Sequence, residues 1–260
     1  EQGARMAGFG GYDMPIQYAT GILAEHLWTR ASCGLFDVSH MGPCFLDLPE
    51  LGGAEAHARI AAVFEPLVCA DIRGLKPGEQ KLTLLLNPAG GVLDGLMVAR
   101  PAEPESQRRL YIVVNAGTKE ADFARIEAAA SGQAQLTRRD AGALVALQGP
   151  QAEAVLAALF PEIASDLSAM TFMTYRALTL RSGGVLHVTR SGYTGEDGFE
   201  FQLEAAEAEG VVRRLLADAR VKPIGLGARD SVRLEARMCL YGHDLDETTS
   251  PIEAALAWTV

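Results

Sequence analysis

The sequence predicts an α+β fold of mostly antiparallel sheets with flanking helices, and three observations carry that prediction. Segments with the period-two alternation of strands outnumber segments with helical periodicity. Strands and helices are interspersed without the regular strand–helix–strand order that is typical of parallel sheets. Several neighbouring strand segments are separated only by short turns containing Gly or Pro, which favours hairpins.

The strand segments are short, largely apolar and often bounded by Gly or Pro. The segment Pro101-Ala-Glu-Pro104 falls between two strands that can pair, so we interpret it as a loop rather than a domain boundary. The predicted strands cover residues 44–48, 81–86, 93–99, 110–114, 143–147, 175–180, 185–189 and 199–203.

Helical periodicity predicts helices between these strands. Thr118 is a possible N-cap of one helix, and Pro150 stands near the start of another. The predicted helices cover residues 22–30, 120–130, 152–160 and 204–219, and a further helix begins near Gly227.

The composition indicates a soluble globular protein of 260 residues, 48% hydrophobic and 22% charged. A formal net charge of -10 and scattered basic residues argue against a nucleic-acid partner. No run of about 18 apolar residues predicts a membrane span, and the N-terminus lacks the apolar core of a signal peptide. The C-terminus stops within an apolar pattern, from which we expect a truncated chain.

The four cysteines are far apart and have no CxxC spacing, so we expect buried thiols in a reducing compartment and a cytoplasmic protein. The five histidines have no mutual spacing for ligands, so no metal site is expected. We interpret His187 as a packed or hydrogen-bonded strand residue. We interpret Asp37, Ser39 and His40 as a structural hydrogen-bond network, with a functional role as the alternative.

The most informative segment is 190–200, which contains three glycines and three carboxylates between two predicted strands. Gly192, Gly195 and Gly198 permit positive φ angles and close approach of a ligand. Glu200 lies where this segment enters the second predicted strand. A strand is a rigid element on which to place a functional carboxylate. The alternative is an ordinary hairpin with a solvated acidic turn.

Two polar residues on the predicted strands are further candidates for a site. Asp94 follows a Gly-Gly turn among apolar residues, where a carboxylate is costly to bury unless it is paired or protonated. Asn115 ends the strand 110–114, where a turn role and a ligand contact are both open.

Arg229 lies in the first turn of the helix that begins near Gly227. The helix dipole disfavours a cation there, which suggests a functional role for Arg229, such as pairing with an acidic side chain or with a ligand. The alternative is a surface arginine that pairs with Asp230 or Glu235.

Seven motifs occur in one order along nearly the whole chain, and together they resemble the T-protein (aminomethyltransferase) family of the glycine cleavage system. The motifs are Gly8-Phe-Gly-Gly-Tyr-Asp-Met-Pro15, Leu35-Phe-Asp-Val-Ser-His-Met-Gly42, Asn87-Pro-Ala-Gly-Gly-Val-Leu-Asp94, Leu147-Gln-Gly-Pro150, Gly192-Tyr-Thr-Gly-Glu-Asp-Gly198, Gly225-Leu-Gly-Ala-Arg-Asp-Ser231 and Cys239-Leu-Tyr-Gly242.

The resemblance implies a tetrahydrofolate-dependent enzyme with a multi-lobed α+β fold. Such an enzyme takes an aminomethyl group from the lipoyl arm of a carrier (H) protein, releases ammonia and leaves 5,10-methylenetetrahydrofolate. The resemblance also implies that Glu200 and Arg229 contact folate and that Tyr193 and Asn115 match pocket positions. Residues 1–260 are then the folate-binding region, as two intertwined lobes, and a C-terminal barrel-like lobe is absent.

The chain departs from the family pattern at Gly95. Members of the family typically have Asp-Asp where this chain has Asp94-Gly95, and the second carboxylate is the one credited with activating the folate nitrogen. We therefore name Asp94 as the provisional catalytic residue. Neighbouring strand side chains face opposite ways, so Asp94 takes over only if a bulge re-aims it. A related folate-dependent demethylase and a folate-binding paralogue with impaired catalysis are the alternative functions.

Overall fold

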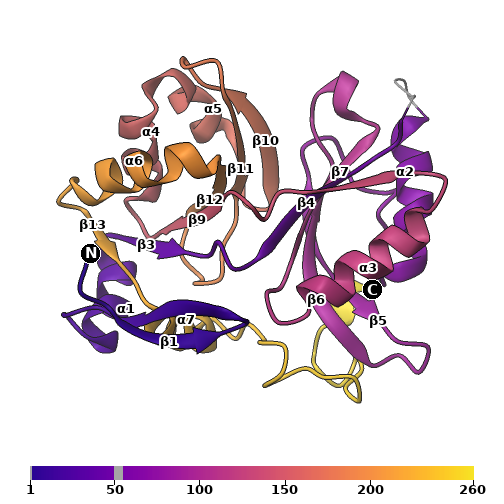
Figure 1. The fold of residues 1–260 in the computed structure, drawn as a ribbon, viewed down its shortest axis with the longest axis horizontal. Coiled ribbons are helices and arrows are strands. Elements are labelled where there is room, and N and C mark those ends of the chain that lie inside the picture. The colour runs from indigo at the N-terminus through magenta and orange to yellow at the C-terminus, as the bar shows by residue number, and fades with distance from the viewer. Residues whose placement is uncertain (1, 50–54) are drawn as a thin grey trace. The chain divides into compact units, whose positions relative to one another are not determined.

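The computed structural model describes residues 2–49 and 55–260 and divides into two compact units. Each unit is assembled from two separate stretches of the chain (Figure 1). Unit 1 comprises Glu1–His40 and Ala141–Met238, and unit 2 comprises Met41–Asp140 and Cys239–Val260.

Unit 1 is built on a six-stranded sheet in which every neighbouring pair is antiparallel except β13 and β3. A separate two-stranded hairpin, β1 with β2, lies on the N-terminal stretch. In sheet order the six strands are β10 (Thr174–Thr179), β11 (Val185–Arg190), β12 (Gly198–Leu203), β9 (Ala143–Gln148), β3 (Cys33–Asp37) and β13 (Val221–Pro223), and the hairpin strands are β1 (Arg5–Phe9) and β2 (Tyr12–Gln17).

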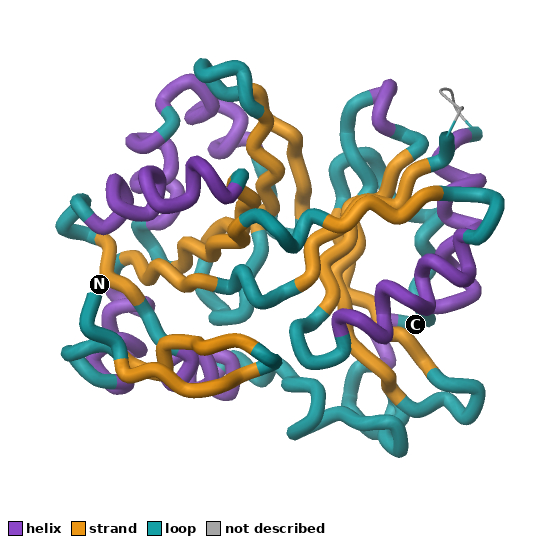
Figure 2. The backbone as a smooth tube through the Cα atoms, in the orientation of Figure 1, coloured by secondary structure: helices purple, strands orange, loops and turns teal. Residues whose placement is uncertain are grey.

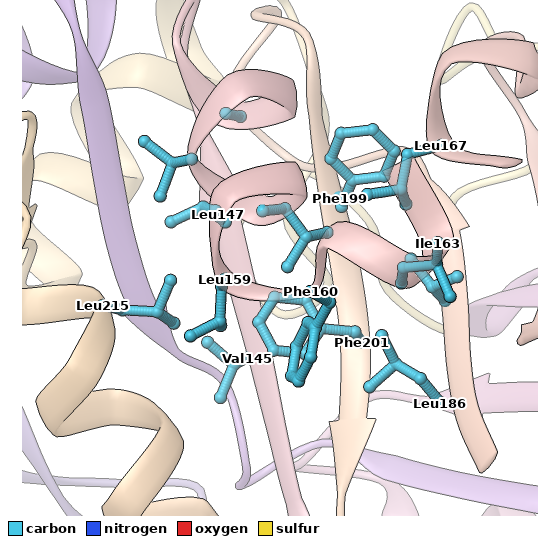
Figure 3. Packing of buried hydrophobic residues seen from close by; sticks show 14 of the residues in the cluster. Val145, Leu147, Leu159, Phe160, Ile163, Leu167, Leu186, Phe199, Phe201 and Leu215 are labelled. Carbon is cyan, nitrogen blue, oxygen red and sulfur yellow. The ribbon is translucent and has the colours of Figure 1, made fainter. Parts of the chain in front are cut away.

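One face of this sheet packs against three helices to form the core of unit 1 (Figure 3). Phe199 and Phe201 of β12 lie in this core, so the residue between them points to the opposite face. On that opposite face α1 packs closely on β3, because a Cβ atom on Gly34 would lie 2.7 Å from Thr29 Oγ1. The core helices are α4 (Ala152–Leu159), α5 (Ala164–Ala169) and α6 (Ala205–Leu216), and the other helices of unit 1 are α1 (Ile22–Ala31) and α7 (Leu226–Glu235).

Unit 2 is built on a five-stranded antiparallel sheet with two helices against one face. The C-terminal stretch of this unit is mostly loop (Figure 2) and buries Leu245 and Leu256 against Leu84 and Val92. In sheet order the strands are β5 (Gln80–Leu86), β6 (Val92–Ala99), β7 (Arg109–Val114), β4 (Gly42–Asp47) and β8 (Gln135–Arg138), and the helices are α2 (Ala56–Phe64) and α3 (Lys119–Ala130).

The predicted α+β class with mostly antiparallel sheets is confirmed. Each predicted strand and helix is present, with ends that differ by a few residues, and the loop at 101–104 connects two strands that pair. Short 3-10 helices cover Glu65–Leu67, Pro104–Ser106, Pro161–Ile163 and Ala257–Thr259. Strands β1, β2, β3, β8 and β13 and helices α2 and α5 were not predicted.

Candidate functional site

The segment that joins β11 to β12 is closed by its own side chains. Arg190 binds Asp197 in a bidentate pair, with Nε 2.9 Å from Oδ1 and Nη2 2.6 Å from Oδ2. Arg190 also pairs with Glu153 of α4, at 2.8 Å. One of the three carboxylates of the segment is therefore part of a structural clamp rather than a solvated turn.

The glycines of this segment permit close packing on β9. Gln148 donates from Nε2 to the Ser191 carbonyl at 2.9 Å and accepts from Thr194 Oγ1 at 2.7 Å. A Cβ atom on Gly192 would overlap the Gln148 side-chain amide, and Gly195 has φ +80°. Both glycines are thus required by the local geometry.

Arg30, in the last turn of α1, joins the same segment to α7. Its guanidinium donates to the Thr194 carbonyl at 2.5 Å and to Glu196 at 3.2 Å. It also donates to the Val232 carbonyl at 3.1 Å and to Glu235 at 2.8 Å. The loop and α7 are therefore held in one fixed arrangement.

Glu200 lies on β12 with its side chain on the face opposite the core. It is half-buried, and no described residue donates a hydrogen bond to its carboxylate. Burial raises the pKa of Glu200, and the positive charge of Arg229 opposes that rise. Among the three carboxylates of the segment, Glu200 differs from Glu196 and Asp197 in lacking an arginine partner among the described residues.

Arg229 is positioned by the start of α7. The carboxylate of Glu25, which is buried, accepts the Gly225 backbone N–H at 2.7 Å. A Cβ atom at Gly225 would collide with the backbone of Ile16, so this position requires glycine. These contacts fix the first turn of α7, from which Arg229 projects.

The surface-arginine alternative for Arg229 is wrong, because its expected partners are taken by other groups. Asp230 accepts from Arg233 Nε at 2.8 Å. Glu235 pairs with Arg30. Among the described residues, neither carboxylate binds Arg229.

The guanidinium of Arg229 instead lies over the ring of Tyr193, with 4.9 Å between Cζ and the ring centroid. Its Nη1 atom is buried and has no hydrogen-bond partner among the described residues. Burial lowers the pKa of Arg229, and Glu200 and Tyr193 oppose that change. Unit 1 thus brings together Glu200, Arg229 and Tyr193, in which two half-buried, oppositely charged side chains lie near one another and Nη1 of Arg229 has no hydrogen-bond partner among the described residues.

Asp94 and Asn115 belong to unit 2 and contact each other directly. Asn115 donates from its backbone N–H to Asp94 Oδ2 at 3.1 Å and from Nδ2 to Oδ1 at 2.8 Å. Asn115 Nδ2 also donates to the Gly95 carbonyl at 2.7 Å. Asp94 is 0% exposed, so the prediction that a carboxylate here must be paired or protonated is confirmed.

A β-bulge does precede Asp94, because Leu85 pairs with Asp94 whereas Leu86 pairs with Val92. The bulge directs Asp94 to the helix-covered face, the same face as Leu96. Gly95 therefore lies on the opposite face. Asp94 does not take the place of a carboxylate at position 95, and its catalytic role stays a prediction.

Asp122, on α3, is a candidate that the sequence analysis missed. It is 0% exposed, and its carboxyl group interacts with that of Asp94. Burial and the charge of Asp94 raise the pKa of Asp122 to about 7. The available signal was helical spacing, since Asp122 stands with Phe123 and Ile126 on the buried stripe of its helix.

Comparison with known proteins identifies the family of the chain. The family model of the GCVT N-terminal domain matches residues 1–260. The chain belongs to the GCVT N-terminal domain family. The resemblance to glycine cleavage T proteins is thereby confirmed.

Relatives of this GCVT N-terminal domain include aminomethyltransferases from animals and bacteria. It is 43% identical over 269 residues to the mitochondrial aminomethyltransferase of Gallus gallus and 44% identical over 270 residues to the aminomethyltransferase of Ralstonia nicotianae. The crystal structure of the glycine cleavage system aminomethyltransferase T from Bartonella henselae matches with a TM-score of 0.87 at 40% identity.

The match covers nearly all of this chain but only part of each relative. It spans 100% of this chain and 63% of the chicken protein, 99% and 68% for the Ralstonia protein, and 100% and 66% for the Bartonella structure. The chain thus spans less than two thirds of the length of the chicken protein.

The contacts around His187 and the 37–40 segment of this GCVT N-terminal domain are those of structural residues, and the cysteines form no disulfide bond. Ser39 donates its backbone N–H to Asp37 Oδ1 at 3.0 Å, and Tyr175 Oη lies 2.7 Å from His187 Nδ1, which supports the structural interpretation of both regions. The four cysteines, all in the described part of the chain, form no disulfide bond, and Cys33 and Cys44 are buried whereas the other two are half-buried. In the described part of the chain, no group of three or more His, Cys, Asp or Glu could hold a metal ion. Nor does that part contain a helix long and apolar enough to cross a membrane.

Proposed function

We propose that Glu200, Arg229 and Tyr193 of unit 1 bind the pterin end of tetrahydrofolate. The observation that carries this proposal is the unused hydrogen-bonding capacity of two partly buried, oppositely charged groups. Burying charges without satisfying them is costly, so a ligand that pairs with both lowers the free energy of the site.

The chemistry of a pterin suits this set of residues. A pterin presents a 2-amino group and a ring N–H side by side, and one carboxylate accepts both as a bidentate pair. The Arg229 guanidinium has a buried N–H to donate to a ligand oxygen. The Tyr193 ring, over which Arg229 lies, keeps that guanidinium in place.

Replacing Glu200 by Gln tests folate binding. The amide keeps the shape of the side chain but loses the charge and one acceptor. Hydrogen bonds to a charged group contribute about 1.5–3 kcal/mol each, so we expect the dissociation constant for tetrahydrofolate to rise roughly tenfold or more. Isothermal titration calorimetry measures it. Glu207→Gln, an exposed position on α6 with the same charge change, is the control and should bind like the wild type. An unchanged constant for Glu200→Gln would remove that residue from the site.

We propose that the protein is an aminomethyltransferase of the glycine cleavage system that uses this folate site. Two folate nitrogens in turn form bonds to the methylene carbon of a lipoyl-bound aminomethyl group, while its bonds to nitrogen and to sulfur break. The two protons released from the folate nitrogens go to the leaving ammonia and to the lipoyl sulfur, which is released as the thiol. The protein contributes by positioning the two substrates and assisting proton movements. The names and close sequence similarity of the relatives support this proposal.

The donor substrate separates this proposal from its alternatives. We expect methylenetetrahydrofolate and ammonia to form when the protein is given tetrahydrofolate and a carrier protein with an aminomethylated lipoyl arm. The same carrier without its lipoyl group is the control and should give neither product. Turnover of N-methyl or S-methyl compounds instead would favour the demethylase. Folate binding without turnover of any donor would favour the impaired paralogue, for which Gly95 is the evidence.

We propose a reducing compartment as the site of action, consistent with the free cysteines. The cytoplasm stays a prediction, and several relatives are named as mitochondrial proteins. The lipoylated carrier protein is the proposed partner, and no metal is required by the proposed reaction.

A further inference from the structure

The carboxylate of Asp94 is a convergence point for hydrogen-bond donors. It accepts from the backbone and the side chain of Asn115 and from the backbone N–H of Gly95, and it also bonds to the Asp122 carboxyl. Each of these bonds stabilises the ionised form of Asp94 and opposes the effect of burial on its pKa. Of the two carboxyl groups, Asp94 is therefore the one equipped to carry the negative charge.

Asp122 has the opposite surroundings. Neither of its carboxyl oxygens has a hydrogen-bond partner of standard geometry among the described residues, and the nearby Thr118 hydroxyl opposes the rise in the pKa of Asp122 only in part. The cation that faces it, Arg125 of the same helix, lies 3.6 Å from Oδ1 and is 40% exposed, which weakens the attraction. Tyr241, on the C-terminal stretch of unit 2, is a second titratable group within range of both carboxyls. A second anion beside Asp94 would be unsolvated and repelled, whereas a carboxylic acid there has a good acceptor in Asp94.

The arrangement also fixes the side-chain amide of Asn115. Its Nδ2 atom donates to an Asp94 oxygen and to the Gly95 carbonyl, which uses both N–H bonds. The Oδ1 atom makes no hydrogen bond to a described residue. The side chain of Asn115, which is half-buried, is thereby held in one orientation. In that orientation its carbonyl oxygen can accept a hydrogen bond from an N–H or O–H of a ligand.

We propose that Asp122 is a positioning residue that, as a neutral acid, donates its carboxyl proton to Asp94 and so locks Asn115 as a hydrogen-bond acceptor for a ligand. The ligand part of this inference rests on the proposed folate function, whereas the proton and the amide orientation belong to the protein alone. The raised pKa of Asp122, about 7, agrees with a neutral acid at and below that pH.

NMR of the full chain without ligand tests the proposal directly. With carboxyl-labelled aspartate, we expect one aspartate of the pair to titrate near pH 7 rather than near 4, the usual value of about 3.9. That titration should disappear in Asp122→Asn and persist in the control Glu127→Gln, an exposed position on the same helix. Titration of both carboxyls at or below about 4 would overturn the proposal.

The matched variants separate positioning from simple structural support. In Asp122→Asn the new amide donates to Asp94 in place of the acid, so the Asn115 side-chain N–H signals should remain protected from exchange. In Asp122→Ala the donor is lost, and that protection should fall. Equal protection in the two variants would contradict the positioning role.

Folate affinity is the second readout. We expect the affinity of the wild type to fall above about pH 7, as Asp122 loses its proton. Asp122→Asn should remove that pH dependence, and Asp122→Ala should bind roughly tenfold more weakly at pH 6. A wild type that binds no folate would contradict the proposed function alone, because the NMR titration is measured on the free protein.

Discussion

Gly95 shows at the scale of one residue how a missing side chain bears on function. A Cβ atom at Gly95 would meet only Leu84 Cδ2, at 3.4 Å, which is ordinary van der Waals contact. The neighbouring Asp94 faces the helices, so an aspartate at position 95 would stand on the other face of β6 without displacing it. Contacts of the first side-chain atom therefore do not impose glycine at this position.

Gly95→Asp should raise turnover with carrier-bound substrate if position 95 holds the missing acid or base. General acid–base groups contribute about 10²–10⁴-fold to rate, so we expect a gain of at least roughly tenfold in a steady-state assay. Gly95→Asn, which has nearly the same shape and no titratable group, is the control. An equal gain from both variants, or no gain from Asp, would argue against the role.

The residue scale also shows where prediction from sequence stops. The sequence showed that the charge of Asp94 must be satisfied, because its neighbours are apolar. Asn115 was named as a separate candidate, without a predicted contact to Asp94. The identity of the partner did not follow, because Asp122 lies on an element that meets β6 only through tertiary packing. Arg229 was picked out by its unfavourable place in a helix, but that it does not pair with Asp230 or Glu235 depended on Arg233 and Arg30 binding those carboxylates.

The loop between β11 and β12 is rigid at the scale of an element. Arg190 closes its base, Gln148 holds its middle from β9, and Arg30 ties it to α7. The rigidity matters because Glu200 and Tyr193 stand at or within this segment. Preorganised side chains bind a ligand with less loss of conformational entropy.

Gly192→Ala should loosen this element. The added methyl group would overlap the Gln148 amide and break its bonds to the loop. We expect the free energy of unfolding in urea to fall by about 1–3 kcal/mol and folate affinity to fall with it. Gly184→Ala, in an exposed turn where the nearest atom would be Ser182 Oγ at 3.6 Å, is the control. Equal stability of the two variants would contradict the packing argument.

Three of the strands that the sequence did not reveal, β1, β3 and β13, lack an alternating pattern for physical reasons. β1 is exposed along its whole length, so it has no buried face to create alternation. Four of the five residues of β3 are buried in succession, which also removes alternation. β13 has only three residues and ends in proline. Alternating hydrophobic patterns are clearest in strands with one buried and one exposed face. These three strands are instead exposed throughout, buried almost throughout, or very short.

At the scale of the whole molecule, each unit depends on pairing between distant parts of the chain. β3 comes from the N-terminal stretch, yet it lies between β9 and β13 in the sheet of unit 1. In unit 2 the C-terminal stretch bonds to β6, where the Val92 N–H meets the Asp246 and Thr249 carbonyls. Local sequence patterns carry no information about such pairings, which explains why many of the elements could be predicted but the pairing of distant strands could not.

The extra residue at Leu93 has a consequence for comparing related chains. This residue shifts the alternation of side chains along β6 by one position. Before it, even-numbered positions such as Val92 lie on the same face as Gly95. After it, even-numbered positions lie on the same face as Asp94. A related strand of the same length but without the bulge would, with Val92 in the same register, present its aspartate to the other side of the sheet, although the aligned residues were identical. Equivalence between such chains therefore has to be judged by strand register and not by aligned letters.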